Sequence, residues 1–498
     1  MKRLIGAIAV LVVLVMVTTA TAKLSRGDQS KIRKWLAVWF DTGDKNREEA
    51  RAELTAFLSH KRKIKELKEV EALAEIVGGS ANRDALRPRQ GVVTSQQWAL
   101  KDQGIDSSEK FPFVVSVPKK YSGTGSEPWP MILCLPDKGE KAEDYMEKYW
   151  NNSAIRNEYL IFVLGFEYRD VKVKKQRTVE EKKGDDEIRV RIEDYEETVP
   201  FSWTERPQYM HALVRFWGSM AKFQKNDYKV DPNRIILDGH GFGADGVLNY
   251  AAGSAWRFAG VILRGGSAES PILSNLAHLP ILSYPEDSGT SEGSEAAHAK
   301  LKAAQGDNYA VADAGAEWSG AAADGGAKLH EWLGKARRNR YPVPSKWVKD
   351  APANYTGYWL SINKSFVEGP SEATIDAAKG KIEITTVNVA SFDLYLNDLL
   401  VNLDKEFELI VNGESRGKFK KERSAVEFIS HLMNKAPRDL GCVFTAEMLE
   451  IEIAPPPAKD DGDAGDGKAK DGEKKDGEKK DGEKKDGEKK DSKKKAGD

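Results

Sequence analysis

Apolar residues near the start of the chain recur with the spacing of amphipathic helices. One stripe follows the i, i+3, i+4, i+7, i+8 rule and consists of Ile32, Trp35, Leu36, Trp39 and Phe40. A second stripe runs through residues 54–77 and is followed by two glycines, which is typical of a helix end. The pattern predicts a small helical unit within residues 23–90, whose tryptophans we expect to pack against a neighbouring part of the protein.

From residue 111 the pattern changes to short apolar runs separated by amphipathic segments. The runs at 111–117, 131–135, 160–164 and 235–237 have the length of buried strands, and residues 210–223 have the periodicity of a helix. Such alternation predicts an α/β domain over residues 91–342, with a mainly parallel sheet covered by helices. A charged insertion at 168–196 suits either a long β-hairpin or a solvated loop.

Beyond residue 342 alternating strands replace most of the helices. Strand patterns occur at 381–387, 391–396 and 407–411, and one helical stripe contains Val426, Ile429, Leu432 and Met433. We therefore predict a β-rich, sandwich-like domain over residues 343–454. Residues 455–498 hold four copies of Asp-Gly-Glu-Lys-Lys and no large apolar residue, so we expect this tail to be disordered.

The first residues have the pattern of an export signal. Lys2 and Arg3 precede an apolar run at residues 4–17, and Ala20-Thr21-Ala22 provides a small-residue cleavage site. We expect a signal peptide over residues 1–22 and a protein exported to the periplasm, the cell envelope or the extracellular space. The alternative is an uncleaved N-terminal membrane anchor, because residues 4–22 are just long enough to span a bilayer.

Charge and cysteine content narrow the class of protein. The 77 basic and 78 acidic residues nearly cancel, which removes the basic footprint of a nucleic-acid-binding protein, so we expect no nucleic-acid partner. The two cysteines, Cys134 and Cys442, fall in different predicted domains, which favours free thiols over a disulfide framework. The sequence contains no metal-ligand cluster, phosphate loop or dinucleotide fingerprint, and we expect no cofactor and no metal.

The segment with the clearest chemical pattern is Gly239-His240-Gly241-Phe242-Gly243, which follows a buried strand and opens a helix. In a nucleophile elbow, small residues flank a nucleophile on a strained strand-to-helix turn, in the pattern Gly-x-Ser-x-Gly. Here Gly241 takes the place of the serine. Glycine tolerates the strained backbone, so the fold can persist without the oxygen nucleophile.

This segment and the strands around it resemble the esterase, polyhydroxybutyrate-depolymerase-like and dienelactone-hydrolase-like branch of the α/β-hydrolase superfamily. The resemblance covers residues 110–340 and implies a triad in the order Ser, Asp, His along the chain. On that reading Asp287 occupies the acid position, whereas Ala316 stands where the resemblance places the histidine. Where a His-Gly pair would follow residue 135, the chain has Pro136 and Asp137, and a carboxylate there opposes an oxyanion.

Three hypotheses about function follow. The first is an exported pseudo-esterase without catalysis that acts as a binding or scaffolding protein, with vestigial positions Gly241, Asp287 and Ala316. Its retained pocket would be lined by His240, Phe242, Ser267 and Glu269. The second is an active ester or peptide hydrolase in which Ser267, His240 and Asp287 converge. The third is a structural cell-envelope protein. The pattern specifies neither the ligand, the partner nor the oligomeric state.

Overall fold

The computed structural model describes much of the chain between residues 25 and 455. The described residues are 25–40, 45–60, 73, 91–99, 110–122, 128–165, 171–182, 188–199, 228, 230–267, 272–284, 292–312, 316–321, 326–350, 356–378, 380–430, 446 and 448–455. The predicted signal peptide, the helix predicted over 210–223 and residues 456–498 of the repeat tail lie outside them.

An eight-stranded sheet forms the first large part of the fold. Its strands are β1 (Gly91–Ala99), β2 (Lys110–Val117), β3 (Trp129–Leu135), β4 (Leu160–Leu164), β7 (Val230–His240), β8 (Gly260–Arg264), β9 (Ile281–Tyr284) and β10 (Tyr309–Val311). Their order across the sheet is β1-β2-β4-β3-β7-β8-β9-β10. The strands from β4 to β10 in that order run parallel, and β1 and β2 form an antiparallel edge, so the prediction of a mainly parallel sheet is confirmed.

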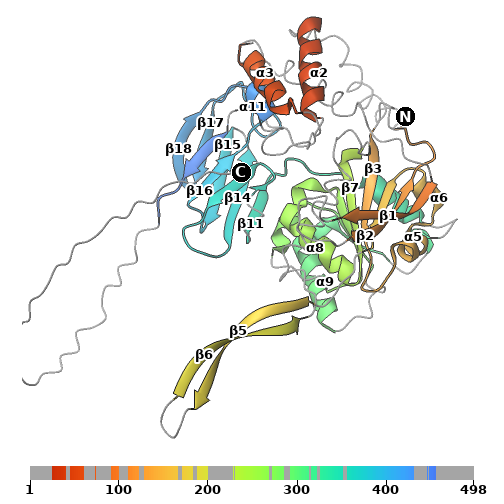
Figure 1. The fold of residues 1–498 in the computed structure, drawn as a ribbon. Helices are drawn as coiled ribbons and strands as arrows, with labels where there is room; N and C mark the ends of the chain where they lie inside the picture. The colour runs from red at the N-terminus through yellow and green to blue at the C-terminus, as the bar shows by residue number, and fades with distance from the viewer. Residues whose placement is uncertain are drawn as a thin grey trace, which may run out of the picture. The chain divides into compact units, whose positions relative to one another are not determined.

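Helices cover both faces of this sheet (Figure 1). They are α5 (Ala142–Trp150), α6 (Ser153–Arg156), α8 (Phe242–Ser254), α9 (Glu292–Gln305) and α10 (Ala327–Lys335), with short 3-10 helices η2 (Ala255–Arg257), η3 (Leu273–Leu276), η5 (Gly306–Asn308) and η6 (Ala316–Trp318). Alternate residues of β3 belong to two separate hydrophobic cores, because successive side chains of a strand point to opposite faces. Helix α8 packs in one core, and α5 and α10 pack in the other. Burial on both faces explains why the central strands are continuous apolar runs.

Two further sheets form the β-rich part of the chain. One has the order β11-β14-β15-β17-β18 and the other the order β12-β13-β16-β19. Their strands are β11 (Ser345–Lys349), β12 (Thr356–Gly357), β13 (Leu360–Lys364), β14 (Ser371–Ala378), β15 (Lys381–Val387), β16 (Ser391–Leu394), β17 (Phe407–Val411), β18 (Glu414–Phe419) and β19 (Leu449–Glu452). Buried and exposed residues alternate along β14 and β15, so one face of their sheet lies in the core. The predicted β-rich architecture is confirmed.

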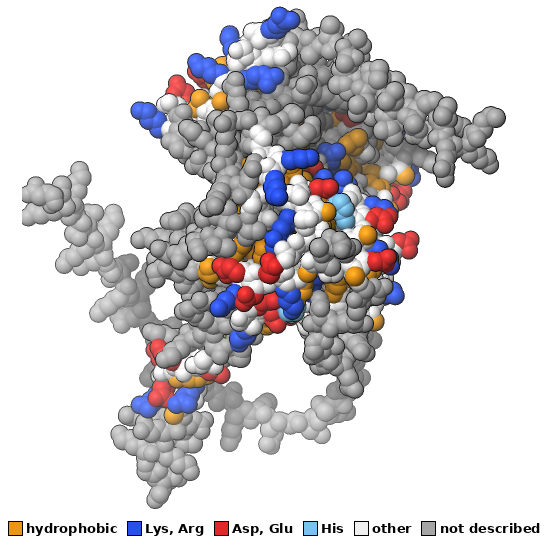
Figure 2. All heavy atoms as spheres, turned by 90° about the vertical axis from the view of Figure 1, so that its right-hand side faces the viewer, with side chains coloured by type: hydrophobic (Ala, Val, Ile, Leu, Met, Phe, Trp, Pro, Cys, Tyr) orange, Lys and Arg blue, Asp and Glu red, His pale blue; other side chains and the backbone are white. Residues whose placement is uncertain are grey.

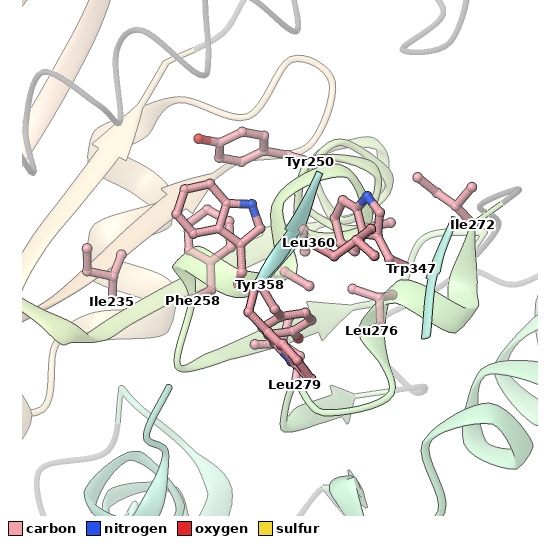
Figure 3. Packing of buried hydrophobic residues seen from close by; sticks show 14 of the residues in the cluster. Ile235, Tyr250, Phe258, Ile272, Leu276, Leu279, Trp347, Tyr358 and Leu360 are labelled. Atoms are coloured by element: carbon pink, nitrogen blue, oxygen red, sulfur yellow. The ribbon is translucent and has the colours of Figure 1, made fainter. Parts of the chain in front are cut away.

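Strand β11 and the segment that follows it pack against η3 and α8 through an apolar cluster and one buried side-chain amide. Figure 3 shows Trp347 and Tyr358 close to Leu276 and Leu279, and all four residues belong to one hydrophobic core. The side chain of Asn275 donates to the carbonyl groups of Ala252 and Val348 and accepts from the Val348 amide. The amide of Asn275 therefore joins the end of α8 to strand β11.

The remaining elements are a helical pair, a short helix and a hairpin. Helices α2 (Arg26–Phe40) and α3 (Arg47–His60) pack together, and α3 also contacts α11 (Ala425–Ser430). Strands β5 (Val171–Lys182) and β6 (Ile188–Val199) pair antiparallel as a separate two-stranded sheet. None of the helices in the described part of the chain is long and apolar enough to cross a membrane. The domain boundaries at residues 90, 342 and 454 stay predictions.

Candidate functional site

Strand β7 turns sharply into helix α8 at Gly241, where the sequence predicts a nucleophile elbow. Gly241 has a φ of 53° and a ψ of −119°, a backbone conformation that strongly favours glycine. The two flanking glycines allow strand and helix to approach closely. A Cβ atom on Gly243 would lie 2.1 Å from the carbonyl oxygen of Leu135, and one on Gly239 would lie 2.6 Å from that of Gly243. This strand, turn and helix have the geometry of an elbow.

The carboxylate of Asp137 occupies the space in which a nucleophile side chain would begin. A Cβ atom on Gly241 would lie 2.3 Å from Asp137 Cγ and 2.4 Å from both carboxylate oxygens. Asp137 Oδ1 accepts hydrogen bonds from the backbone amides of Phe242 and Lys138, each at 2.7 Å. The carboxylate therefore caps the first turn of α8, where the helix dipole favours negative charge.

These two amides are the groups from which an oxyanion hole is built. In an α/β-hydrolase the hole consists of the amide after the nucleophile and an amide from the loop that follows β3. Phe242 holds the first position here, and Lys138 lies in the loop between β3 and α5. Both donors already bind an internal anion. An oxyanion could use them only after Asp137 had moved away, and it would be repelled by that carboxylate while it stayed.

His240 and Glu140 form a half-buried pair beside this carboxylate. His240 Nδ1 lies 2.8 Å from Glu140 Oε2, which also accepts from the backbone amide of Asp137 at 3.0 Å. Burial lowers the pKa of His240, but the hydrogen bond and charge of Glu140 outweigh burial and leave that pKa raised. Burial raises the pKa of Glu140, and the bonds from His240 and the Asp137 amide reverse this and leave it lowered. The charged form of the pair is therefore favoured.

A fully buried ion pair links Asp238 on β7, three residues before Gly241, to Arg264 on β8. Asp238 Oδ1 accepts from Arg264 Nε at 3.0 Å, and Asp238 Oδ2 accepts from the side chains of Tyr145 at 2.8 Å and Trp150 at 2.7 Å. The Arg264 guanidinium also lies over the ring of Tyr284, 4.4 Å from its centroid. The network joins β7 and β8 to helix α5, and it fixes the strand that carries the elbow.

The other pocket residues predicted from sequence are not joined to His240 by any hydrogen bond among the described residues. The Ser267 amide and hydroxyl both donate to Asp245 Oδ1, at 2.7 and 2.9 Å, whereas the His240 ring pairs with Glu140. Phe242 packs its ring against the hydrophobic core, which leaves its backbone amide as the group that faces the site. Ser267 and His240 thus have separate carboxylate partners.

The two remaining triad positions each come after a strand of the eight-stranded sheet. Ala316 begins η6, after β10, and its side chain is exposed. Asp287 follows β9 in the sequence but lies outside the described residues, as does Glu269. Cys134 on β3 is a buried free thiol, and burial raises its pKa, with the charge of Asp238 next in effect. Among the described residues no cluster of His, Cys, Asp and Glu could hold a metal ion.

Sheet order and elbow geometry together identify the architecture. The fold is that of the α/β-hydrolases. No protein-family model matches the sequence, and no curated protein matches it. Solved structures similar to this chain include a thermostable esterase, 14% identical with a TM-score of 0.32, over 49% of this chain and 64% of the esterase. This chain thus spans less than two thirds of that esterase.

Two further solved structures that are similar to this chain are also an esterase and a hydrolase by name. A ferulic acid esterase is 12% identical with a TM-score of 0.30, over 50% of this chain and 98% of the esterase. An S-formylglutathione hydrolase from Agrobacterium tumefaciens is 12% identical with a TM-score of 0.26, over 44% of this chain and 84% of the hydrolase.

Proposed function

We propose that this protein is a non-catalytic α/β-hydrolase-fold protein that is exported and acts as a binding or scaffolding protein. The observation that carries the proposal is the occupied elbow. Gly241 offers no nucleophile, and the Asp137 carboxylate accepts from the two amides that would bind an oxyanion. A protein whose transition-state donors bind its own carboxylate has no site for the developing charge of acyl transfer.

A hydrolase with a relocated nucleophile is the competing proposal, and the hydrogen bonds at the elbow do not favour it. A nucleophilic serine needs a base within hydrogen-bonding reach, and that base must be free to take its proton. The hydroxyl of Ser267 donates to Asp245 instead. The third proposal, a structural protein of the cell envelope, needs no cleft and differs from ours in its response to mutations near the elbow.

The described residues on the face shown in Figure 2 give no support to a polyanionic or polycationic partner. On the face shown in Figure 2, acidic and basic side chains are interspersed over the described residues. This distribution agrees with the near-zero net charge of −1. A protein or small-molecule partner bound by shape and mixed polar contacts fits such a surface better than a nucleic acid does.

The absence of catalysis is tested with a fluorophosphonate probe, which labels activated serines. We expect no labelling of the natural protein and none of a Gly241→Ser, Ala316→His variant, because the Asp137 carboxylate, although displaced by the serine Cβ, stays beside the oxyanion donors and repels the developing charge. Addition of Asp137→Ala should allow the new serine to react. Labelling of the natural protein that persists in a Gly241→Ala variant would overturn the proposal.

Export and binding require separate measurements. Sequencing of the N-terminus of the protein isolated from its own cells should give Lys23 as the first residue if the signal peptide is cleaved.

For the binding role, a deletion strain should be complemented by the natural gene and by an Ala316→Gly variant. A Lys138→Glu variant, which reverses an exposed charge in the loop beside the elbow and keeps the backbone amide, should complement poorly while remaining folded and correctly located. Equal complementation by both variants would favour the structural cell-envelope proposal.

A further inference from the structure

The hairpin of β5 and β6 is a long ribbon with two open edges. Each strand has 12 residues, and among the described residues the two strands pair only with each other. A two-stranded sheet is at best marginally stable in water, and its outer edges carry backbone groups that can pair with another strand. The ribbon therefore has the geometry of a strand-pairing surface, provided that a partner strand matches its side chains.

We propose that β6 pairs antiparallel with β6 of a second copy of this chain, so that the two copies of Ile192 lie opposite each other on either side of the two-fold axis. The two hairpins then form one continuous four-stranded antiparallel sheet. This surface uses none of the residues of the candidate site, so the proposal stands or falls independently of the absence of catalysis.

The exposed side chain of Ile192 marks the position of the axis. Ile192 is 70% exposed. No other large hydrophobic side chain among the described side chains of the hairpin is as exposed. In a symmetric antiparallel pair of identical strands, the two-fold axis passes midway between one residue and its own copy, which lie directly opposite each other. With Ile192 there, two isoleucines that are otherwise exposed bury apolar area against each other, as cross-strand apolar pairs do.

The two charged residues that flank this position complement each other across the proposed axis. With Ile192 on the axis, Arg191 lies opposite Glu193 of the second copy, and by symmetry Glu193 lies opposite the second Arg191. Cross-strand pairs of opposite charge stabilise a sheet, and like charges directly opposite destabilise it. Arg191 and Glu193 are already close on one face of the same strand, with Arg191 Nη2 3.9 Å from Glu193 Oε1. Each can therefore meet its counterpart without changing faces.

Neighbouring registers lack this complementarity. Moving the axis one residue along the chain places Glu193 opposite its own copy, and moving it one residue back does the same to Arg191. A further step forward places Asp194 opposite itself. Charges that only kept an exposed edge soluble would not need this symmetry about an apolar residue, so the pattern favours one dimeric register over a blunted edge.

The register is tested by disulfide cross-linking of the purified protein carrying Ile192→Cys and Cys442→Ser. Paired strands place the two copies of residue 192 within disulfide range, since opposing Cα atoms lie about 4.5–5.5 Å apart. The matched control is Thr178→Cys in the same background, because Thr178 lies opposite Ile192 on the other strand of the hairpin. We expect the dimer to form at least about tenfold faster at 192, since pairing raises the effective concentration of the thiols.

A charge-swap experiment tests the same register without cysteine chemistry. Arg191→Glu places glutamates opposite each other in the dimer. Glu193→Arg places arginines opposite each other, and combining it with Arg177→Glu keeps the ion pair that Arg177 and Glu193 form within the hairpin. Each variant alone should be monomeric by sedimentation equilibrium, and an equimolar mixture should form a heterodimer because both cross-strand pairs are then complementary.

Any one of several results would overturn the proposal. These are a natural protein that stays monomeric at every concentration tested, equal cross-linking rates at 178 and 192, and a charge-swap mixture that remains monomeric although each variant shows the natural circular dichroism spectrum. Faster cross-linking at 178 would assign the pairing edge to β5 instead and would equally contradict a dimer through β6.

Discussion

The contact between Gly241 and the Asp137 carboxylate can be measured as a coupling energy. Two separate effects oppose a side chain at position 241. An alanine must adopt the positive φ of Gly241, which costs about 1–2 kcal/mol. Its Cβ also needs the space of the carboxylate, and displacing Asp137 breaks charge-assisted hydrogen bonds worth about 1.5–3 kcal/mol. Gly241→Ala should therefore lower the free energy of unfolding by about 2.5–5 kcal/mol.

The double-mutant cycle separates these effects. Asp137→Ala alone removes only the hydrogen bonds, at a cost of about 1.5–3 kcal/mol. Once the carboxylate is gone, Gly241→Ala should cost only the backbone strain of about 1–2 kcal/mol. The two substitutions should therefore couple by about 1.5–3 kcal/mol, with the double variant more stable than the sum of the single effects.

Hydrogen exchange of the α8 amides reports this coupling, because α8 begins at the residue whose amide Asp137 caps. Gly253→Ala is the matched control on the same helix, since a Cβ there would meet nothing within 4 Å. It should stabilise α8 by about 0.5–1 kcal/mol and add independently to Asp137→Ala. Additivity of Gly241→Ala and Asp137→Ala to within about 0.5 kcal/mol would refute the assignment of the carboxylate to the elbow.

Three further substitutions test the surroundings of the elbow. Asp238→Ala leaves the Arg264 charge buried and should cost about 3–5 kcal/mol in denaturant unfolding followed by tryptophan fluorescence. Glu140→Gln should lower the pKa of His240 in an NMR titration. The raised pKa of His240 gives stability that is lost as pH rises through it, and the lowered pKa of Glu140 gives stability that is lost as pH falls through it, so Glu140→Gln should destabilise most at weakly acidic pH. Asn275→Ala removes three buried hydrogen bonds and should cost about 2–4 kcal/mol, with exchange protection lost together in η3 and β11.

The main features of the fold were predictable because short apolar runs and amphipathic segments alternate so regularly along the chain. Continuous apolar runs such as 160–164 become central strands, and β4 has these same bounds. Strand β10 was not predicted, because its three residues are half-buried or exposed and form too short a run to stand out. Strand β1 was missed for a related reason, since its sequence mixes Gln and Ser with Val and Trp, as an edge strand can.

Only part of the site could be predicted, because its contacts join distant segments. The elbow is local, and its three glycines lie at alternate positions within five consecutive residues. Asp137 contacts an amide 105 residues later in the chain, and Glu140 contacts a histidine 100 residues later. The sequence showed that a carboxylate stood where an oxyanion would be repelled, but nothing in its spacing indicated that this carboxylate accepts from the Phe242 amide. The Asp238 and Arg264 pair was missed because a charge in an apolar strand gives no sign of its partner.

The changes at residues 137 and 241 restrict each other. A serine at 241 and the carboxylate of Asp137 need the same space, so neither a serine at 241 nor an empty oxyanion hole can be introduced alone without a cost to the fold. If the Asp137 carboxylate is removed first, the first turn of α8 loses its cap. If the serine is added first, it displaces the carboxylate from that cap, and the negative charge stays beside the oxyanion donors. Relaxed selection on the nucleophile alone would leave an empty elbow. A carboxylate that fills the elbow and accepts from both amides stabilises the start of α8, and it makes an elbow without a side chain at residue 241 the more stable arrangement of this fold.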